Sequence, residues 1–353
     1  MSRLPNIDTS EVLDVADVDH DSWNDFADAQ GWTDGLPVVP PGEALVELFL
    51  ETCRGDEEAF GTLSPRPLSP TLRSAAANAV MAGCRPEYFP VVVAALRAIC
   101  VPGYNLHGTL ATTHPCGPTI LVSGPIRHDL SINFGTNCFG QGWRANATIG
   151  RALALIIRNV GGGIPGATDR ATQGSPSKYS FCFGENEEEC PWPPYRVRRG
   201  FAPEDSIVTV FSTEPPHNIN DHASSNGESL LTTVASVMSQ SGANSMYGDG
   251  PTLLAFSPEH ASTLHRDGWT IEAIQSRLFE LARIPTAQVS VENQEAFGRS
   301  GRKPEHGGYS ITPKAEDIHI VVAGGAGKHS AWIPSFGATE PVCVRIKQAG
   351  GAG

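Results

Sequence analysis

A lysine and a glutamate stand seven residues apart in the segment GSPSKYSFCFGEN, residues 174–186, and both side chains could move protons. Lys178 is the only lysine in the first 302 residues of a chain that has 20 arginines and five lysines. Burial shifts the pKa of both groups toward neutrality, and a lysine can lose its proton where an arginine cannot. We therefore predict that Lys178 and Glu185 are catalytic, with Tyr179 as an aromatic wall beside the amine. An ordinary ion pair is the alternative, and a shared site needs a bend, because positions 178 and 185 of a regular strand face opposite sides.

The segment GQGWRANATIGRA, residues 140–152, indicates an anion-binding loop in front of a helix. Glycines let a ligand approach the backbone, and the free N–H groups at a helix N-terminus attract anions. We assign Arg144, Asn146 and Arg151 to substrate binding, with Asn146 also as the helix N-cap. The spacing does not match the GxGxxG fingerprint of dinucleotide-binding proteins. A Gly-rich turn that caps a buried helix is the alternative.

A second Gly-rich loop, Ala-Gly-Gly-Ala-Gly-Lys-His-Ser over residues 323–330, follows a strand-like run. It departs from the phosphate loop GxxxxGK[ST], because a histidine separates Lys328 from Ser330, and we exclude a nucleoside triphosphatase. Ligands usually bind at the carboxyl ends of the strands of such sheets, so we assign Gly325, Lys328 and His329 to substrate binding. Asn186 joins this substrate-binding set.

Histidines and cysteines leave a metal site open as an alternative. His114 is a further catalytic candidate. Two groups could supply metal ligands, although neither has a diagnostic spacing: His107, His114 and Cys116, and His217, Asp221 and His222. An iron–sulfur site could be formed by Cys116, Cys138 and Cys182. Our prediction is nevertheless that no cofactor is bound, with zinc or iron as the alternative.

The elements that must position these residues follow from hydrophobic periodicity. Helices are expected over about 69–82, 86–100, 147–160, 228–239 and 270–283, and strands over 119–123, 207–211, 252–256, 318–323 and 342–346. This alternation predicts an α/β fold with mainly parallel sheet covered by helices, in two related halves. The expected divisions are an acidic N-terminal arm (1–60), a first half (61–204), a second half (205–347) and a flexible tail (348–353). The irregular segment 161–203 should line a pocket together with the 140–146 loop.

The distribution of charge favours an anionic small molecule as the partner. The net charge is −13, and residues 1–60 hold 15 acidic side chains against two arginines, whereas residues 61–200 hold 13 basic side chains against seven acidic ones. A nucleic-acid-binding protein would show a concentrated basic face. The acidic start of the chain lacks the features of a signal peptide, and no apolar run approaches the length of a membrane span. We expect a cytoplasmic protein, a homo-oligomer, without nucleic-acid or membrane partners.

Several segments resemble an uncharacterised bacterial family related to the selenoproteins with a Sec-Gly-Ser-Cys motif. These are GWTDGLPVVPP (31–41), RANATIGRAL, GSPSKYSFCFGENEE and PEHASTLHRDGW. The motif itself and its Cys-Gly-Ser-Cys equivalent are absent from this chain, so redox chemistry of that pair is not implied. The resemblance implies an enzyme-like bacterial protein.

Together these patterns predict an enzyme that acts on a small carboxylate-bearing or acyl substrate by proton transfer, as a lyase or hydrolase. A metal- or iron–sulfur-dependent hydratase or hydrolase is one alternative. A non-catalytic ligand-binding or assembly subunit is the other.

Overall fold

The computed structural model describes residues 19–56 and 58–347. The helices are α1 (His20–Ala29), α2 (Glu43–Glu51), α3 (Leu72–Met81), α4 (Phe89–Cys100), α5 (Leu106–Ala111), α6 (Ile126–Asp129), α7 (Arg144–Asn159), α8 (Tyr195–Arg198), α9 (Gly227–Met238), α10 (Pro258–Arg266), α11 (Ile271–Leu281) and α12 (Val291–Arg299). The strands are β1 (Gly117–Ser123), β2 (Cys182–Gly184), β3 (Ile207–Thr213), β4 (His217–Asn220), β5 (Thr252–Phe256), β6 (Arg283–Pro285), β7 (Gly308–Ser310), β8 (Ile318–Val322), β9 (His329–Pro334) and β10 (Val342–Arg345). The tail from 348 onward lies outside the described residues.

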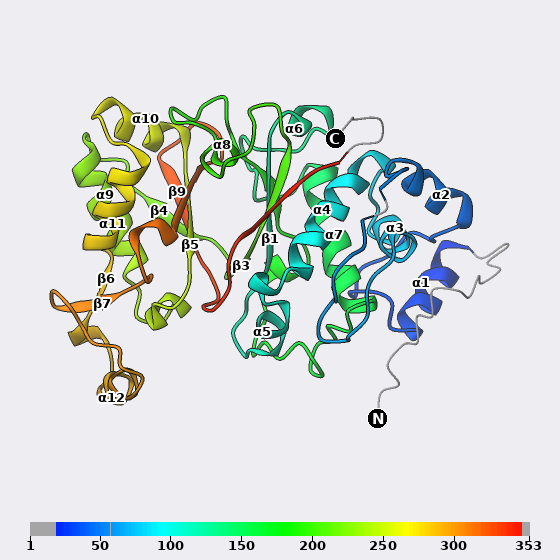
Figure 1. The fold of residues 1–353 in the computed structure, drawn as a ribbon, viewed down its shortest axis with the longest axis horizontal. Coiled ribbons are helices and arrows are strands. Elements are labelled where there is room, and N and C mark those ends of the chain that lie inside the picture. Colours follow the sequence, from blue (N-terminus) through cyan, green and yellow to red (C-terminus); the bar gives the residue numbers. More distant parts are fainter. Residues whose placement is uncertain (1–18, 57, 348–353) are drawn as a thin grey trace.

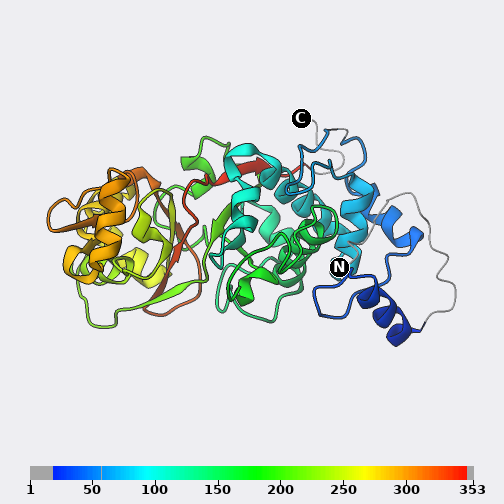
Figure 2. The same cartoon turned by 90° about the horizontal axis from the view of Figure 1, so that it is seen from below.

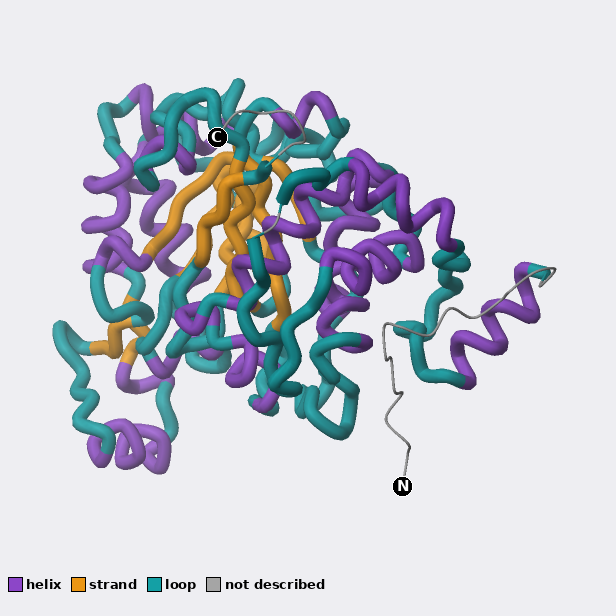
Figure 3. Tube along the Cα trace, turned by 45° about the vertical axis from the view of Figure 1, so that its right-hand side comes forward, coloured by secondary structure: helices purple, strands orange, loops and turns teal. Residues whose placement is uncertain are grey.

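Two four-stranded sheets lie face to face in the middle of the molecule, and helices cover both outer faces (Figure 1). Residues on the inner faces of both sheets, such as Leu121, Phe211 and Ile333, form one apolar core between them. A second core lies between the first sheet and α3, α4 and α7, and a third between the second sheet and α9, α10 and α11. Side chains alternate along each strand, so one residue points into the core between the sheets and the next into the core beneath the helices. Figure 3 shows the strands gathered between the helical layers.

Each sheet is mixed, so the α/β class is confirmed but the mainly parallel sheet is not. The strand orders are β10-β3-β1-β2 and β4-β9-β5-β8. Only β1 with β2 and β5 with β8 pair in parallel, and the other pairs within these sheets are antiparallel. The connection from β8 to β9 explains the difference. It spans residues 323–328, whereas a parallel return needs a crossover of a dozen or more residues.

The two sheets share one topology and exchange their last strand. In each, the two parallel strands are followed by a strand that runs back beside the first of them, and the next strand crosses to the other sheet. Thus β4, which follows β3, pairs with β9, and β10, which follows β9, pairs with β3. The two crossings meet where Thr213 and Ser335 form an antiparallel bridge. The view in Figure 2 shows the two ends of the molecule joined through these crossing segments. The exchange makes each sheet depend on both parts of the chain.

The beginning of the described chain packs on the helical layer of the first sheet. Trp23 of α1 is 1% exposed and donates from its indole N–H to the carbonyl oxygen of Val38. Arg151 of α7 forms two hydrogen bonds of 2.8 Å with the Asp34 carboxylate. The Asp34 pKa is lowered, because these bonds outweigh the effect of burial. The segment from 31 to 41 is therefore fixed against α7, and it lines none of the cavities considered below.

Among the described residues, none of the helices is by itself long and apolar enough to cross a bilayer. One bent pair, Pro86–Cys100 with Pro102–Ala111, meets the requirements of length and composition together, with a bend of 77°.

Candidate functional site

All four parallel strands end at the same edge of the double sheet. Asn186, just after β2, donates from its backbone to the carbonyl of Val322 at the end of β8, and from its side chain to Gly324. The helices that follow β1 and β5, α6 and α10, lie at this edge, which is at the top of Figure 1. Ligands of open α/β sheets usually bind at the carboxyl ends of the strands, so a ligand site is expected at this edge.

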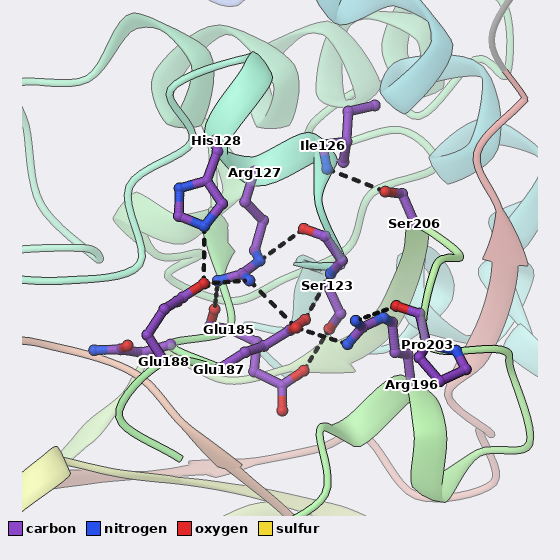
Figure 4. Close-up of polar contacts among 12 residues, drawn as sticks. Ser123, Ile126, Arg127, His128, Glu185, Glu187, Glu188, Arg196, Pro203 and Ser206 are labelled. Carbon is purple, nitrogen blue, oxygen red and sulfur yellow. Dashed lines mark hydrogen bonds and ion pairs between the residues drawn. The ribbon is translucent and has the colours of Figure 1, made fainter.

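In the first sheet this edge is closed by a network of buried charges (Figure 4). Arg127 of α6 is 2% exposed and contacts Glu187 at 3.3 Å and Glu188 at 3.1 Å. Arg196 contacts the same Glu187 at 2.6 Å, and the backbone N–H of Gly124 donates to it at 2.6 Å. The arginines and carboxylates neutralise each other within the protein. This network is built to hold the edge together.

Glu185 and Lys178 do not share a site. Glu185 is fully buried, and its carboxylate accepts hydrogen bonds from the Ser123 hydroxyl and the Tyr195 backbone N–H, while burial raises its pKa. Lys178 instead forms an ion pair of 2.7 Å with Asp169. It also donates a hydrogen bond to the carbonyl of Cys116, the residue before β1. The two groups thus lie at opposite ends of β1, about 20 Å apart for a strand of this length. The predicted pair is therefore wrong, and Tyr179, which is exposed, covers no shared pocket.

In the second sheet the same edge is open and holds a cavity of about 340 Å³. Its floor is made of small side chains on the inner sheet face, Ala255, Ala323 and Ala331. Residues 137–140 from the first part of the chain cover it, and no aspartate or glutamate is among its lining residues. We call this cavity the inter-sheet pocket. Small floor residues leave room for a ligand where larger side chains would fill the space.

His329, Asn218 and His222 lie at the mouth of the inter-sheet pocket. His329 is the first residue of β9 and shares the inward face with Ala331, because side chains of a strand alternate. Its Nδ1 lies 3.0 Å from Oδ1 of Asn218 on β4. Its Nε2 lies 3.2 Å from Nε2 of His222, and both imidazoles are exposed. Since the amide oxygen accepts, Nδ1 carries the hydrogen and Nε2 of His329 presents its lone pair.

The Gly-rich loop after β8 forms one wall of the mouth. A Cβ atom at Gly325 would lie 2.1 Å from Oγ1 of Thr136, so only glycine allows the loop to pack against the residues that cover the pocket. Within the described chain, the N–H groups of Gly325, Ala326 and Gly327 donate to no protein atom. Lys328 donates from Nζ to the His222 carbonyl at 3.2 Å. The loop therefore presents free amide donors and one ammonium group beside His329.

A serine–histidine pair nearby has the contacts of a nucleophile and its base. Ser330 is among the lining residues of the pocket, but the alternation of β9 directs its side chain to the opposite face of the sheet. Oγ of Ser330 lies 2.7 Å from Nδ1 of His260, and His260 Nε2 lies 3.1 Å from the Asp221 carbonyl. Ser330 shares its strand face with Trp332, which packs in the core toward the helices. Burial lowers the pKa of His260, in keeping with that position. The pair stabilises the packing of α10 on the second sheet.

The first Gly-rich loop contributes structure more than ligand contacts. Arg144 begins α7 and donates to the carbonyl of Gly83. Asn146 is buried. Its Oδ1 accepts from the backbone N–H of Asn133 at 2.8 Å, and its Nδ2 donates to the carbonyl of Asn133 at 2.9 Å. The predicted N-cap at Asn146 is wrong, since Trp143 takes that position and helical residues begin at 144. Arg151 holds the segment around Asp34 and does not face the pocket.

The irregular segment 161–203 lines a different cavity from the predicted one. Ala167, Thr168 and Arg170 form a cavity of about 330 Å³ together with residues of α5. The 140–146 loop contributes Gly140 to the inter-sheet pocket instead. The prediction that the two segments share a pocket is therefore wrong.

The largest of the cavities considered, about 540 Å³, lies at the opposite edge of the double sheet. Its lining residues include three carboxylates, Asp249, Asp317 and Glu340, and a single lysine or arginine, Lys314. An anion would be repelled there. The inter-sheet pocket, which lacks carboxylates, suits an anion better.

His114 is paired with a carboxylate outside the cavities. Its Nε2 lies 2.6 Å from Oε1 of Glu214, which also accepts from the backbone of Asn244 and lies 3.4 Å from His217. Burial by itself would raise the Glu214 pKa, but these donors outweigh it and lower the pKa to about 2. His217 is the first residue of β4, and His222 lies two residues beyond the last. The two histidines are therefore at opposite ends of the strand and form no cluster.

We expect Glu214→Gln to lower the free energy of unfolding by about 3 kcal/mol near pH 7. A carboxylate with a lowered folded-state pKa stabilises the fold above its unfolded pKa, near 4.3, and this contribution is lost as the pH falls toward 2. The difference between wild type and variant should therefore be constant above pH 5 and shrink between about pH 4.5 and 2. Denaturant titrations across this range measure it. A difference that is the same at pH 3 and pH 7 would contradict the assignment.

The cysteines considered for an iron–sulfur site are free thiols. Cys116, Cys138 and Cys182 are buried, and burial raises the pKa of the first two to about 11 and about 12. Across residues 19–56 and 58–347, no group of three or more His, Cys, Asp or Glu side chains is arranged to hold a metal ion.

Sequence reasoning found the Gly-rich loop, Lys328 and His329, but it missed Asn218 and the pairing of His222 with His329. No local pattern could have assigned Asn218 to a strand, because His-Asn-Ile-Asn has Ile219 as its single buried residue. The pairing of β4 with β9 had no local signal, because it depends on the exchange of strands between the sheets.

The resemblance to the Sec-Gly-Ser-Cys family remains a prediction, because no family model, no curated protein and no solved structure matches this chain.

Proposed function

We propose that the chain is an enzyme of the hydrolase or lyase type for a small carboxylate-bearing or acyl compound, which it binds in the inter-sheet pocket. One observation carries the proposal. The cavity at the carboxyl edge has an apolar floor and an imidazole at its mouth, and the loop that connects its lining residues Gly324 and His329 carries the free amide donors of Gly325–Gly327. Its volume of about 340 Å³ is at the small end of ligand pockets.

The residues around the pocket have distinct roles in this proposal. The amides of 325–327 and the ammonium group of Lys328 hold the anionic group of the substrate. The alanine floor accommodates its apolar part. His329, oriented by Asn218, activates the water or takes up the proton in the reaction.

A substrate panel tests this function. Short acyl esters, amides, lactones, 2-hydroxy acids and 2-oxo acids are incubated with the protein, and products are followed by NMR spectroscopy. At least one compound should be converted. For that compound, Lys328→Met should raise KM by roughly 10-fold or more with a smaller change in kcat, because a charge-assisted contact to the bound anion is lost.

Lys303→Met is the matched control, since Lys303 is exposed and lies between α12 and β7, outside the Gly-rich loop. It should leave KM unchanged. If Lys328→Met leaves KM unchanged as well, the anion is not held at this loop and the proposed site is wrong.

A further inference from the structure

We propose that His222 and His329 together bind a divalent transition-metal ion at the mouth of the inter-sheet pocket. The metal site is argued from the two imidazoles alone. Its use in the reaction rests on the proposed function: with an ion bound, His329 would serve as a ligand, and the ion would activate the water in place of the free imidazole.

The separation of the two nitrogens fits two ligands of one ion. Nε2 of His222 and Nε2 of His329 lie 3.2 Å apart. With metal–nitrogen bonds of about 2.0–2.1 Å, ligands at a tetrahedral angle are about 3.4 Å apart and ligands at a right angle about 2.9 Å. The observed distance lies between these values. An ion bound to both nitrogens would therefore sit to one side of the line that joins them, and both rings would turn toward it while the nitrogens keep nearly their present separation.

The backbone holds the two histidines in register. β4 and β9 pair with Asn220 opposite His329, and His222 follows two residues later. The N–H of Asp221 donates to the carbonyl of Lys328, which extends the contact of the two chain segments beyond the strand. Lys328 Nζ in turn donates to the His222 carbonyl. These contacts fix the backbone that carries both imidazoles, so less entropy is lost when an ion joins them.

Asn218 supplies the outer contact that metal-binding histidines usually have. It accepts from Nδ1 of His329 at 3.0 Å, which fixes the ring and leaves Nε2 as the lone-pair nitrogen. Two imidazole ligands favour zinc, cobalt, nickel or copper over magnesium and calcium, which prefer oxygen. In the part of the chain that the structure describes, no third His, Cys, Asp or Glu side chain completes a metal-binding group with these two histidines. The other coordination positions would thus fall to water and to the anionic substrate.

Such an ion would make the reaction a hydrolysis. A metal-bound water releases one proton to solvent at lower pH than free water, and the hydroxide adds to the acyl carbon. The bond from that carbon to the leaving group then breaks, and the leaving group takes up a proton from solvent. The overall change is the addition of one water molecule across the acyl bond, with no change in oxidation state.

The test is a titration with Co²⁺ and Zn²⁺ alone at pH 7.5, followed by calorimetry and by the visible absorption of Co²⁺. The wild-type chain should bind one equivalent. His222→Asn and His329→Asn should each weaken binding by roughly 10-fold or more, and Asn218→Leu should weaken it by about 10- to 100-fold. His306→Asn is the control, because His306 is exposed, lies outside the pocket and has a positive φ of 50°, which asparagine accepts. It should bind as the wild type does.

Equal binding by the wild type and by the two histidine variants would overturn the metal site. Turnover that depends on His329 while no metal binds would overturn the metal site and leave the proposed function in place. Metal binding that needs both histidines, with no turnover by the metal-loaded protein of any compound in the panel, would keep the site and overturn the function.

Discussion

His329→Gln is expected to reduce kcat by roughly 10²-fold or more for any compound that the wild type converts. Glutamine is close in size and can still accept from or donate to Asn218, but it cannot serve as a base near neutral pH. Its amide also binds a transition metal poorly. His329 is exposed at the mouth of the pocket, so the change should leave the fold intact. Steady-state kinetics, with circular dichroism as the check on folding, measure the effect.

Two further variants separate this expectation from its rivals. His306→Asn should leave kcat unchanged. Lys178→Arg tests the earlier sequence-based hypothesis that Lys178 is the catalytic base. Its ion pair with Asp169 can be kept by an arginine, so we expect kcat within a few-fold of the wild type. A large loss of kcat in Lys178→Arg together with normal kcat in His329→Gln would reverse the assignment.

The helices and strands were predictable where an apolar pattern is long. The helix expected over 86–100 corresponds to a short 3-10 turn and α4, whose residues from Phe89 to Ile99 are all buried. The strand predicted over 252–256 is β5 to the residue. The direction of the strands was not predictable in this way, because the apolar run of a buried strand is the same in a parallel and an antiparallel pair. Short strands were missed for a different reason. β4 has a single buried residue, which is too little for a pattern.

The site was predictable only in its local part. Gly325, Lys328 and His329 follow a strand in sequence, and a Gly-rich loop at the end of a strand is a local signal. The orienting Asn218 and the covering segment 137–140 come from two other places in the chain, and the floor residue Ala331 belongs to β9, which was not predicted. The rarity of lysine drew attention to Lys178, but rarity gives no information on location. Its partner proved to be Asp169, which no spacing rule connects to it.

The buried network at the edge of the first sheet is the reason why we do not place the proposed site at that edge, and Arg127→Met tests this. The Arg127 guanidinium donates to the carbonyls of Gly124 and Glu185 and to Glu188, and it contacts Glu187. Methionine fills much of the volume but removes the guanidinium, so the carbonyls of Gly124 and Glu185 each lose one donor and the buried Glu187 keeps a single arginine, Arg196. Removing one partner of a buried charge network typically costs about 3–5 kcal/mol. We expect a decrease of that size in the free energy of unfolding, measured by urea titration.

Arg277→Met is the matched control, because Arg277 also forms ion pairs with two glutamates, Glu228 and Glu280, but does so at the surface. Solvent screens such pairs, so the control should change the urea midpoint little. Under conditions where Arg127→Met remains folded, its kcat for a compound from the panel should match the wild type, since the network does not line the inter-sheet pocket. A variant with wild-type stability and lost turnover would show the opposite. It would place the reaction at the charged edge of the first sheet, where Glu185 is buried and its pKa is raised.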